Sequence, residues 1–159
     1  MLDRFFRSVV YARLHPDTLS VRDVSSGREV KGPPVVAISR NPEKVLAVGA
    51  AAMTAGAPEI INPFKHPRTL VADFTAAQVV LKGFFKQLFD GRLFAPAPTV
   101  VLHPKVDPEG DFTQIEIRAL AELALGAGAS KVVIWHGRDL ADGELKELRF
   151  GSGGRLLYP

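Results

Sequence analysis

The sequence predicts an α/β domain whose five-stranded mixed sheet, a three-stranded meander plus two parallel strands, carries helices on its faces. Short strand-like segments separated by turn residues open the chain, and two continuous apolar and β-branched runs follow at 98–103 and 131–135. Such runs are typical of strands buried on both faces. A segment with apolar residues at helical spacing precedes each run, and strands joined through helices lie parallel with right-handed connections.

The meander is predicted from the turns between its strands. Two strand-like segments, 9–13 and 18–24, flank the sequence HPD at 15–17, where proline and aspartate favour a tight turn. The sequence SSG at 25–27 predicts a second turn, and residues 34–38 (PVVAI) a third strand.

Two helices are predicted from their apolar faces. The first begins near Thr75. The second follows Thr113, which is expected to form a capping box with Glu116, and it ends at the glycines 126 and 128. The residues expected to face the core are Ala77, Val80, Leu81, Phe84 and Leu88 in the first helix and Ile117, Leu120, Ala121 and Ala124 in the second.

We expect one domain over residues 1–140. Within it, residues 40–72 are rich in glycine, proline and alanine and show no sustained periodicity, which predicts a small irregular insertion. Residues 141–159 are expected to form a C-terminal tail, in which the sequence GSGG at 151–154 is flexible.

The composition is that of a soluble globular protein, with 47% hydrophobic and 23% charged residues in a chain of 159. No apolar run reaches the roughly 18 residues that a membrane-spanning helix needs. The absence of cysteine excludes disulfides and favours a cytoplasmic location. The net charge of +3 comes from scattered basic residues without a row of stacking aromatics, so nucleic acid is not an expected partner.

The start of the chain is amphipathic at helical spacing. Leu2, Phe5, Phe6 and Val9 share one face, with arginines on the other. Two interpretations stay open. The apolar face can lie in an anionic membrane surface, at the inner face of the membrane. Alternatively it packs against its own domain or a partner, which is favoured because short amphipathic segments usually cover a core.

Several stretches, in the same order along the chain, resemble the MreB family of bacterial actin-like proteins. The sequences PPVVAI (33–38) and KVLAVG (44–49) resemble the family's EPSVVAI…KVLAVG. The segments NPFK (62–65) and LVADF (70–74) are similar to RPMKDGVIADF, and residues 113–129 to TQVERRAIRESAQGAGA. The resemblance runs from about residue 1 to 136 and implies the ribonuclease-H-like first half of the actin fold. Because a full member is about twice as long, we expect the N-terminal half only.

The resemblance also implies where the family binds nucleotide, and this sequence departs from the pattern there. The family cradles ATP phosphates in a turn that reads DLGTANT, and the matching residues are ARLHPDT. Ala12 replaces the aspartate that organises the metal, Leu14 replaces a glycine that lets backbone approach phosphate, and Pro16 lacks an N–H donor. The family's IEEP matches WHGR at 135–138, which contains no carboxylate. The degenerate cleft positions are Ala12, Leu14, His15, Pro16, Asp17, Thr18, His136 and Gly137.

Three histidines define a competing hypothesis. His15, His103 and His136 should each follow the carboxyl end of a strand, the edge where open α/β sheets bind ligands. Three imidazoles could hold Zn²⁺ with water in the fourth position. The chain would then be a metal- or ligand-binding protein that reuses the former nucleotide cleft. Hydrogen-bonded surface histidines are the simpler interpretation, because the linear spacing does not demand a metal.

The substitutions remove the metal-binding and positioning groups on which phosphoryl transfer depends, so neither an enzymatic activity nor a bound cofactor is expected. The sequence therefore predicts a non-catalytic MreB-like protein that acts in cell-shape or cytoskeletal organisation through protein–protein contacts. The expected partner is a full-length actin-like filament protein or a second copy of the chain.

Overall fold

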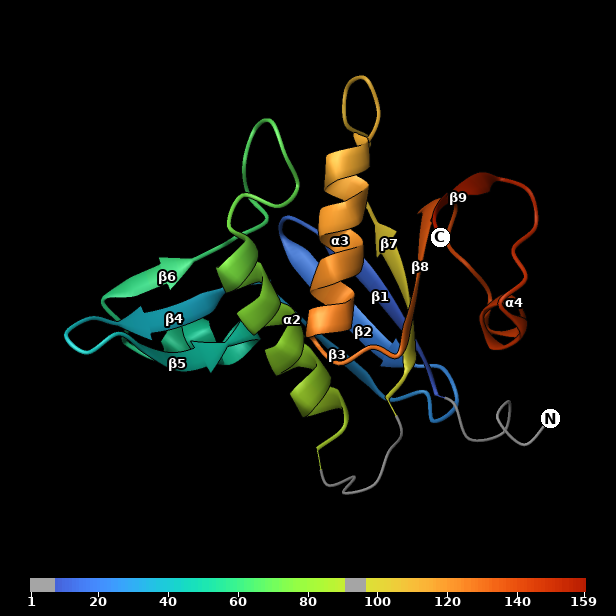
Figure 1. Ribbon diagram of the computed structural model, residues 1–159. Helices are drawn as coiled ribbons and strands as arrows, with labels where there is room; N and C mark the ends of the chain where they lie inside the picture. Colours follow the sequence, from blue (N-terminus) through green and yellow to red (C-terminus); the bar gives the residue numbers. More distant parts are fainter. Residues whose placement is uncertain (1–7, 91–96) are drawn as a thin grey trace.

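The computed structural model describes residues 8–90 and 97–159, whose strands form two sheets (Figure 1). The main sheet has the strand order β3-β2-β1-β7-β8-β9, and the small sheet the order β5-β4-β6. The strands of the main sheet are β1 (Val9–His15), β2 (Thr18–Asp23), β3 (Glu29–Gly32), β7 (Thr99–Pro104), β8 (Lys131–Gly137) and β9 (Gly154–Tyr158). The other elements are β4 (Val36–Ser39), β5 (Lys44–Val48), β6 (Glu59–Ile61), the 3-10 helix η1 (Gly49–Thr54), and the α-helices α2 (Phe74–Leu88), α3 (Gln114–Gly126) and α4 (Asp142–Glu147).

The main sheet joins an antiparallel meander to two parallel strands, which confirms the predicted fold class. β1 pairs antiparallel with β2 and parallel with β7, and β7 pairs parallel with β8. The helix α2 lies between β1 and β7 in the chain, and α3 lies between β7 and β8. Every residue of β7 is buried, as expected for a central strand covered on both faces.

The third meander strand is β3, not the predicted segment 34–38. β4 lies there instead and belongs to the small sheet. Two prolines, Pro33 and Pro34, separate β3 from β4 and cannot donate to a ladder, so the pairing ends there. β3 (EVKG) is a half-exposed edge strand with alternating polar residues, and its apolar signal in the sequence is accordingly weak.

The region 40–72 is more regular than predicted, because β5, η1 and β6 form within it. β5 and β6 pair antiparallel with the two sides of β4. The small sheet packs against α2 at Gly83, where a Cβ atom would lie 2.9 Å from Cγ1 of Val48. These strands are only three to five residues long, and their formation depends on this packing more than on local periodicity.

The predicted tail is also structured. Residues 142–147 form α4, and β9 pairs antiparallel with β8, so the sheet has six strands where five were predicted. Glu144 fixes the connection: it accepts from the guanidinium of Arg138 and from the backbone N–H groups of Ala141 and Gly151. These hydrogen bonds, those from Arg138 most of all, lower the pKa of Glu144 to about 2.

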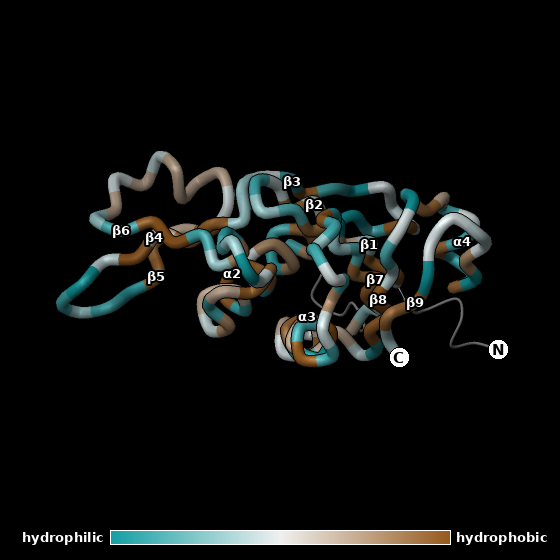
Figure 2. The backbone as a smooth tube through the Cα atoms, turned by 90° about the horizontal axis from the view of Figure 1, so that it is seen from above, coloured by the Kyte–Doolittle hydropathy of each residue, from teal (hydrophilic) through white to brown (hydrophobic). Residues whose placement is uncertain are grey.

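The two faces of the main sheet are covered differently. In Figure 2, α2 and α3 lie side by side along one face. They bury a large core that includes Val10, Ala12, Leu102 and Ile134. The other face buries a smaller cluster, in which Tyr11, Val101 and Trp135 pack with Leu140 and with Leu145 of α4.

The helix starts follow their sequence signals. Thr113 and Glu116 form the predicted capping box, and the side chain of Asp73 accepts from the backbone N–H of Ala76 at the start of α2. Within the part of the chain that the structure describes, no helix is both long and apolar enough to cross a membrane.

The pairing of β9 with β8 predicts that Gly154→Ala loosens this edge of the sheet. A Cβ atom at residue 154 would overlap the Trp135 ring and lie 2.7 Å from the carbonyl oxygen of His136. We expect faster amide hydrogen exchange over residues 154–158 and a free energy of unfolding lower by about 1–3 kcal/mol. The control is Gly143→Ala, where a Cβ atom meets nothing within 4 Å. Unchanged exchange in Gly154→Ala would contradict the close packing.

Candidate functional site

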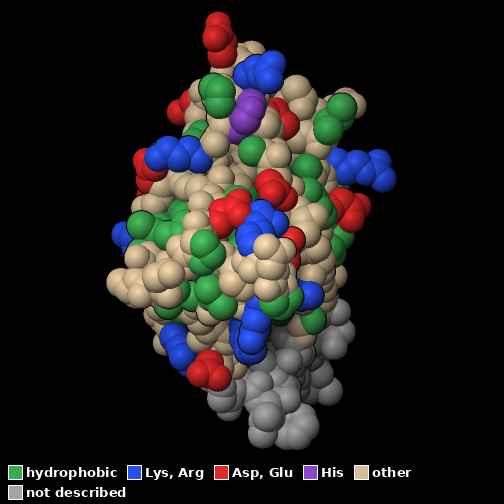
Figure 3. Space-filling model, turned by 90° about the vertical axis from the view of Figure 1, so that its left-hand side faces the viewer, with side chains coloured by type: hydrophobic (Ala, Val, Ile, Leu, Met, Phe, Trp, Pro, Cys, Tyr) green, Lys and Arg blue, Asp and Glu red, His purple; other side chains and the backbone are tan. Residues whose placement is uncertain are grey.

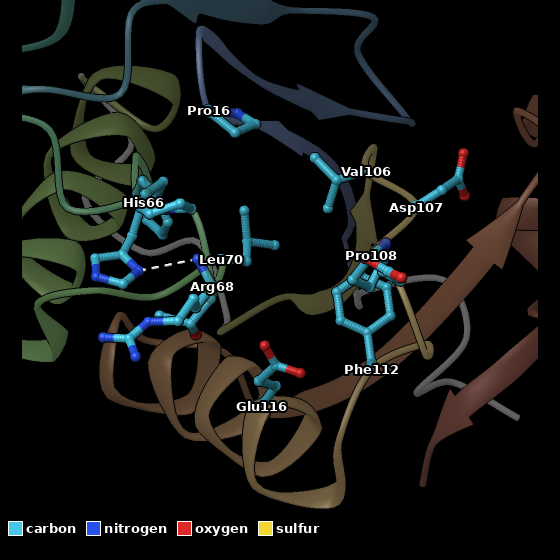
Figure 4. A pocket seen from close by; sticks show the side chains of 13 residues that line it. Pro16, His66, Arg68, Leu70, Val106, Asp107, Pro108, Phe112 and Glu116 are labelled. Carbon is cyan, nitrogen blue, oxygen red and sulfur yellow. Dashed lines mark hydrogen bonds between the residues drawn. The ribbon is translucent and has the colours of Figure 1, made fainter.

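A cavity of about 400 Å³ opens where the turn between β1 and β2 faces the start of α3 (Figure 4). Pro16 lies on one side of it, the loop before α2 on a second and the loop after β7 on a third, while Glu116 of α3 closes the fourth. The remaining lining residues are Phe64, His66, Pro67, Arg68, Thr69, Leu70, Val106, Asp107, Pro108, Glu109 and Phe112.

The charged groups of this cavity are mostly acidic. Asp107, Glu109 and Glu116 line it together with a single guanidinium, that of Arg68. Glu116 is held by the capping box at Thr113, and Asp107 accepts from Nε2 of His136 at 2.9 Å. An excess of carboxylates repels a bare polyphosphate. The cavity therefore suits a neutral or cationic ligand better than a free anion.

Ala12 and Leu14, two of the degenerate cleft positions, lie in the core and not in the cavity. The side chain of Ala12 is 0% exposed and that of Leu14 is 3% exposed, and both belong to the core beneath α2 and α3. Pro16 lines the cavity. The turn itself is held by side chains: His15 Nδ1 accepts from the backbone N–H of Asp17 at 3.0 Å, and the Asp17 carboxylate pairs with Lys65. Thr18 pairs with His15 across the hairpin.

The structure does not bring the three histidines together. His15 is exposed at the hairpin turn. His103 is buried beside Tyr11, which belongs to the cluster on the α4 side of the sheet. His136 alternates with Trp135 and lies on the other face, where its ring packs edge-on against Phe112. Among residues 8–90 and 97–159, no group of three or more histidine, aspartate or glutamate side chains is placed to hold a metal ion. The predicted three-histidine site is wrong. Side chains at neighbouring strand positions face opposite ways, so His136 lies on the opposite face of the sheet from His103.

A buried network links Tyr11, His103 and the connection after β8. The Tyr11 hydroxyl lies 2.6 Å from Nδ1 of His103, and Nε2 of His103 lies 3.0 Å from the carbonyl oxygen of Gly137. Because a carbonyl oxygen only accepts, Nε2 carries the proton and Nδ1 accepts from Tyr11. The Tyr11 hydroxyl in turn accepts from the backbone N–H of Leu140 at 3.2 Å. In this network every hydrogen-bond donor therefore faces an acceptor.

Burial decides the charge state of this network. It raises the pKa of Tyr11 and lowers the pKa of His103 to about 4, so both groups are neutral near pH 7. Sequence reasoning took His103 for an edge ligand and did not single out Tyr11. The alternation in VVYARLH places Tyr11, Arg13 and His15 on one face of β1. This pattern indicates that Tyr11 lies on the face opposite Ala12 and Leu14, where the network forms.

The candidate membrane or partner contact at the chain start is only partly described. Leu2, Phe5 and Phe6 lie outside the described residues. Val9 is the first residue of β1 and is buried beside Tyr11, so its place in an amphipathic helix face is wrong. The strand begins at Val9 because its backbone pairs with both neighbours: its register partner in β7 is Thr99, and its carbonyl accepts from Val24.

The mixed sheet with two helices on one face and a cleft at its carboxyl edge is the fold of an actin-like domain, as the comparison with solved structures shows. The crystal structure of MreB5 of Spiroplasma citri bound to ADP shares this fold, with a TM-score of 0.63 and 25% identity over 80% of this chain and 37% of that chain. The non-polymerising A278D mutant of MamK bound to AMPPNP matches with a TM-score of 0.64 and 15% identity, over 80% of this chain and 40% of that chain. The second likeness shows the fold alone.

The family model described as MreB/Mbl protein matches residues 20–141, and the chain belongs to this family. The cell shape-determining protein MreB of Escherichia coli (strain K12) is 35% identical over 111 residues, which are 64% of this chain and 30% of the relative. The cell shape-determining protein Mbl of Bacillus subtilis (strain 168) is 30% identical over 132 residues, or 80% of this chain and 35% of the relative. The chain thus spans about a third of these relatives.

The buried network predicts that Tyr11→Phe lowers the free energy of unfolding by about 1–3 kcal/mol, because the Leu140 N–H and the His103 ring lose their shared partner while they stay buried. Chemical denaturation at pH 7 measures the change. The matched control is Tyr158→Phe, since the Tyr158 hydroxyl makes no hydrogen bond to another described residue. A Tyr11→Phe protein as stable as the control would show that the network contributes nothing.

Proposed function

We propose that this chain is a non-catalytic member of the MreB/Mbl family that acts in the cytoplasm in cell-shape or cytoskeletal organisation. It acts through protein–protein contacts, with a full-length actin-like filament protein or a second copy of itself as partner. Family membership and the cell-shape names of its relatives support the general role. The observation that carries the non-catalytic part is the packing of Ala12 and Leu14.

These two residues occupy the positions that match the family's metal-organising aspartate and phosphate-approaching glycine. Both side chains now contribute to the apolar core beneath α2 and α3. A carboxylate at the Ala12 position would be buried among hydrocarbon, where an unpaired charge costs several kcal/mol. Pro16, which follows them, offers no N–H to a phosphate. This packing supports the proposal that a hydrophobic strand end takes the place of the phosphate cradle.

The small sheet supports the role in protein contacts. Three apolar side chains of this sheet, Val45, Leu46 and Ile60, are between 44% and 47% exposed. Met53 of the adjoining helix η1 is 58% exposed. By register, Val45 shares a face with Ile38, and Ile60 shares the opposite face with Ala37. Figure 3 views the molecule from this end and shows apolar side chains exposed around a group of charged ones. We call Val45, Leu46, Met53 and Ile60 the apolar rim.

Three charged side chains beside the apolar rim are paired within the chain. Arg40 forms ion pairs with Glu43 at 3.0 Å and Glu59 at 2.7 Å. The outer sides of β5 and β6 pair with no other strand in the described part of the chain. An exposed apolar rim with paired charges and two open strand edges favours association with another protein.

We predict that full-length MreB filaments carry this chain into the pellet on ultracentrifugation, and that Val45→Lys combined with Ile60→Lys weakens the co-sedimentation about tenfold. Two lysine ammonium groups at the rim would have to lose their hydration water in the contact. A binding free energy that is weaker by about 1.4 kcal/mol corresponds to this tenfold loss of affinity.

The matched control is Ile115→Lys, which changes an equally apolar side chain, 82% exposed, at the start of α3. This variant should bind like the wild type. Sedimentation-velocity runs on the chain alone test self-association with the same variants. A chain that is monomeric and stays in the supernatant with filaments would overturn the proposal.

A ligand-binding protein that reuses the cleft is the second candidate, and the cavity of about 400 Å³ at Pro16 and Glu116 favours it. Its acidic lining and apolar walls at Phe64, Leu70 and Phe112 suit a neutral or cationic ligand. This candidate requires neither the ATP switch nor the three-histidine metal site.

Isothermal titration of ATP–Mg²⁺ separates the proposal from an ATP-dependent protein. We expect no saturable binding at the cleft, because Leu14 and Pro16 remove the backbone approach and one donor on which a phosphate cradle depends. A full-length MreB titrated under the same conditions is the positive control. Saturable binding of ATP–Mg²⁺ that persists at full strength in a Lys31→Gln chain, which alters a cavity away from the cleft, would mean that the nucleotide site persists, and the non-catalytic assignment would fall.

A further inference from the structure

A second cavity, of about 270 Å³, lies on the face of the main sheet that α2 and α3 leave uncovered. It is lined by Arg13, His15, Thr18, Ser20, Lys31 and Lys105. The face is fixed by the alternation along β1: Ala12 and Leu14 lie in the core beneath the helices, whereas the Arg13 guanidinium stacks 5.7 Å from the Tyr11 ring centroid on the opposite face. This basic cavity is therefore separate from the cleft that Glu116 lines.

Strand register builds the basic cavity. Arg13 of β1 lies opposite Ser20 of β2, and Ser20 lies opposite Lys31 of β3, so the three form one transverse row. Neighbouring strands are about 4.8 Å apart, which places the two cationic stems about 10 Å apart on either side of Ser20. Lys105 joins them from the strand end after β7, where its N–H donates to the carbonyl of Leu14 at 2.7 Å.

The guanidinium of Arg13 forms two long ion pairs, with Glu29 at 3.6 Å and with Asp139 at 3.8 Å, and has unused hydrogen-bonding capacity. Both distances exceed that of a hydrogen bond. Glu29 instead accepts from the Ser20 hydroxyl, and Asp139 accepts from Lys105 at 2.8 Å. In the described part of the chain, the Arg13 side chain makes no hydrogen bond, although it is only 35% exposed.

Lys31 adds a cation without an ion-pair partner among the described residues. In the region that the structure describes, no carboxylate lies within ion-pair distance of its amine. The cavity thus gathers three permanent cations, Arg13, Lys31 and Lys105, around two carboxylates that are already engaged. Like charges on neighbouring strands repel one another, and a bound anion would relieve that repulsion.

We propose that the basic cavity binds a phosphate group. A guanidinium fork matches two phosphate oxygens, and the flexible lysines supply point charges from two sides. The Thr18 hydroxyl adds a neutral donor at the rim. A volume of about 270 Å³ exceeds that of a phosphate ion, so an organic ester or a second phosphate also has room. The group can belong to a soluble phosphate ester or to a lipid headgroup.

Titration with inorganic pyrophosphate, followed by amide NMR shifts and by calorimetry, tests the soluble source. We expect saturable binding with shifts at Ser20 and Lys31, and weaker binding at higher salt. Lys31→Gln should weaken binding about fivefold and Arg13→Gln about tenfold, as expected for the loss of charge-assisted hydrogen bonds. Lys82→Gln, which changes an exposed lysine of α2 on the other face, is the matched control and should bind like the wild type.

Flotation with phosphatidylcholine vesicles that contain phosphatidic acid tests the lipid source. Flotation that Arg13→Gln and Lys31→Gln abolish, and Lys82→Gln does not, supports a headgroup at the same cavity. Two results would overturn the proposal: no saturable binding to either probe, or binding that Lys82→Gln weakens as much as Lys31→Gln. Because Lys31 is exposed, its substitution tests the cavity without disturbing the core.

Discussion

The parallel pairing of β1 with β7 is the constraint on which the rest of the structure depends. Its register, from Val9 with Thr99 to Leu14 with Pro104, puts β1 at the centre of the main sheet. Each side chain of β1 is thereby assigned to one of two faces. Ala12 and Leu14 join the core beneath the helices, while Tyr11 and Arg13 face α4 and the basic cavity. A shift by one residue would exchange these roles entirely.

The two faces have opposite electrostatic character. On the helix side, the cleft of this MreB/Mbl-family chain is bordered by Asp107, Glu109 and Glu116, and its strand end is filled by hydrocarbon. On the other side, Arg13, Lys31 and Lys105 gather around two engaged carboxylates. One scaffold can thus present an acidic cleft on one side and cationic groups on the other, because site chemistry depends on side chains and not on the fold.

Sequence reasoning found the strong local signals and missed the weak ones. The buried runs at β7 and β8 and the capping box at Thr113 are local, because a strand buried on both faces and a helix start carry their own patterns. β3 and β9 are edge strands with mixed polarity, so periodicity did not identify them. The predicted site residue Pro16 lines the cavity at the carboxyl end of β1. The histidines were misplaced, because strand neighbours such as Trp135 and His136 face opposite ways.

The sequence by itself determined the family and the α/β class, since the matched blocks and the buried strand and helix patterns are local features of the chain. Only the tertiary structure decided which residues meet. Tyr11 lies 92 positions before His103 and 129 before Leu140, and Arg13, Lys31 and Lys105 come from three separate segments. Such contacts follow from strand register and sheet closure, which no local pattern encodes.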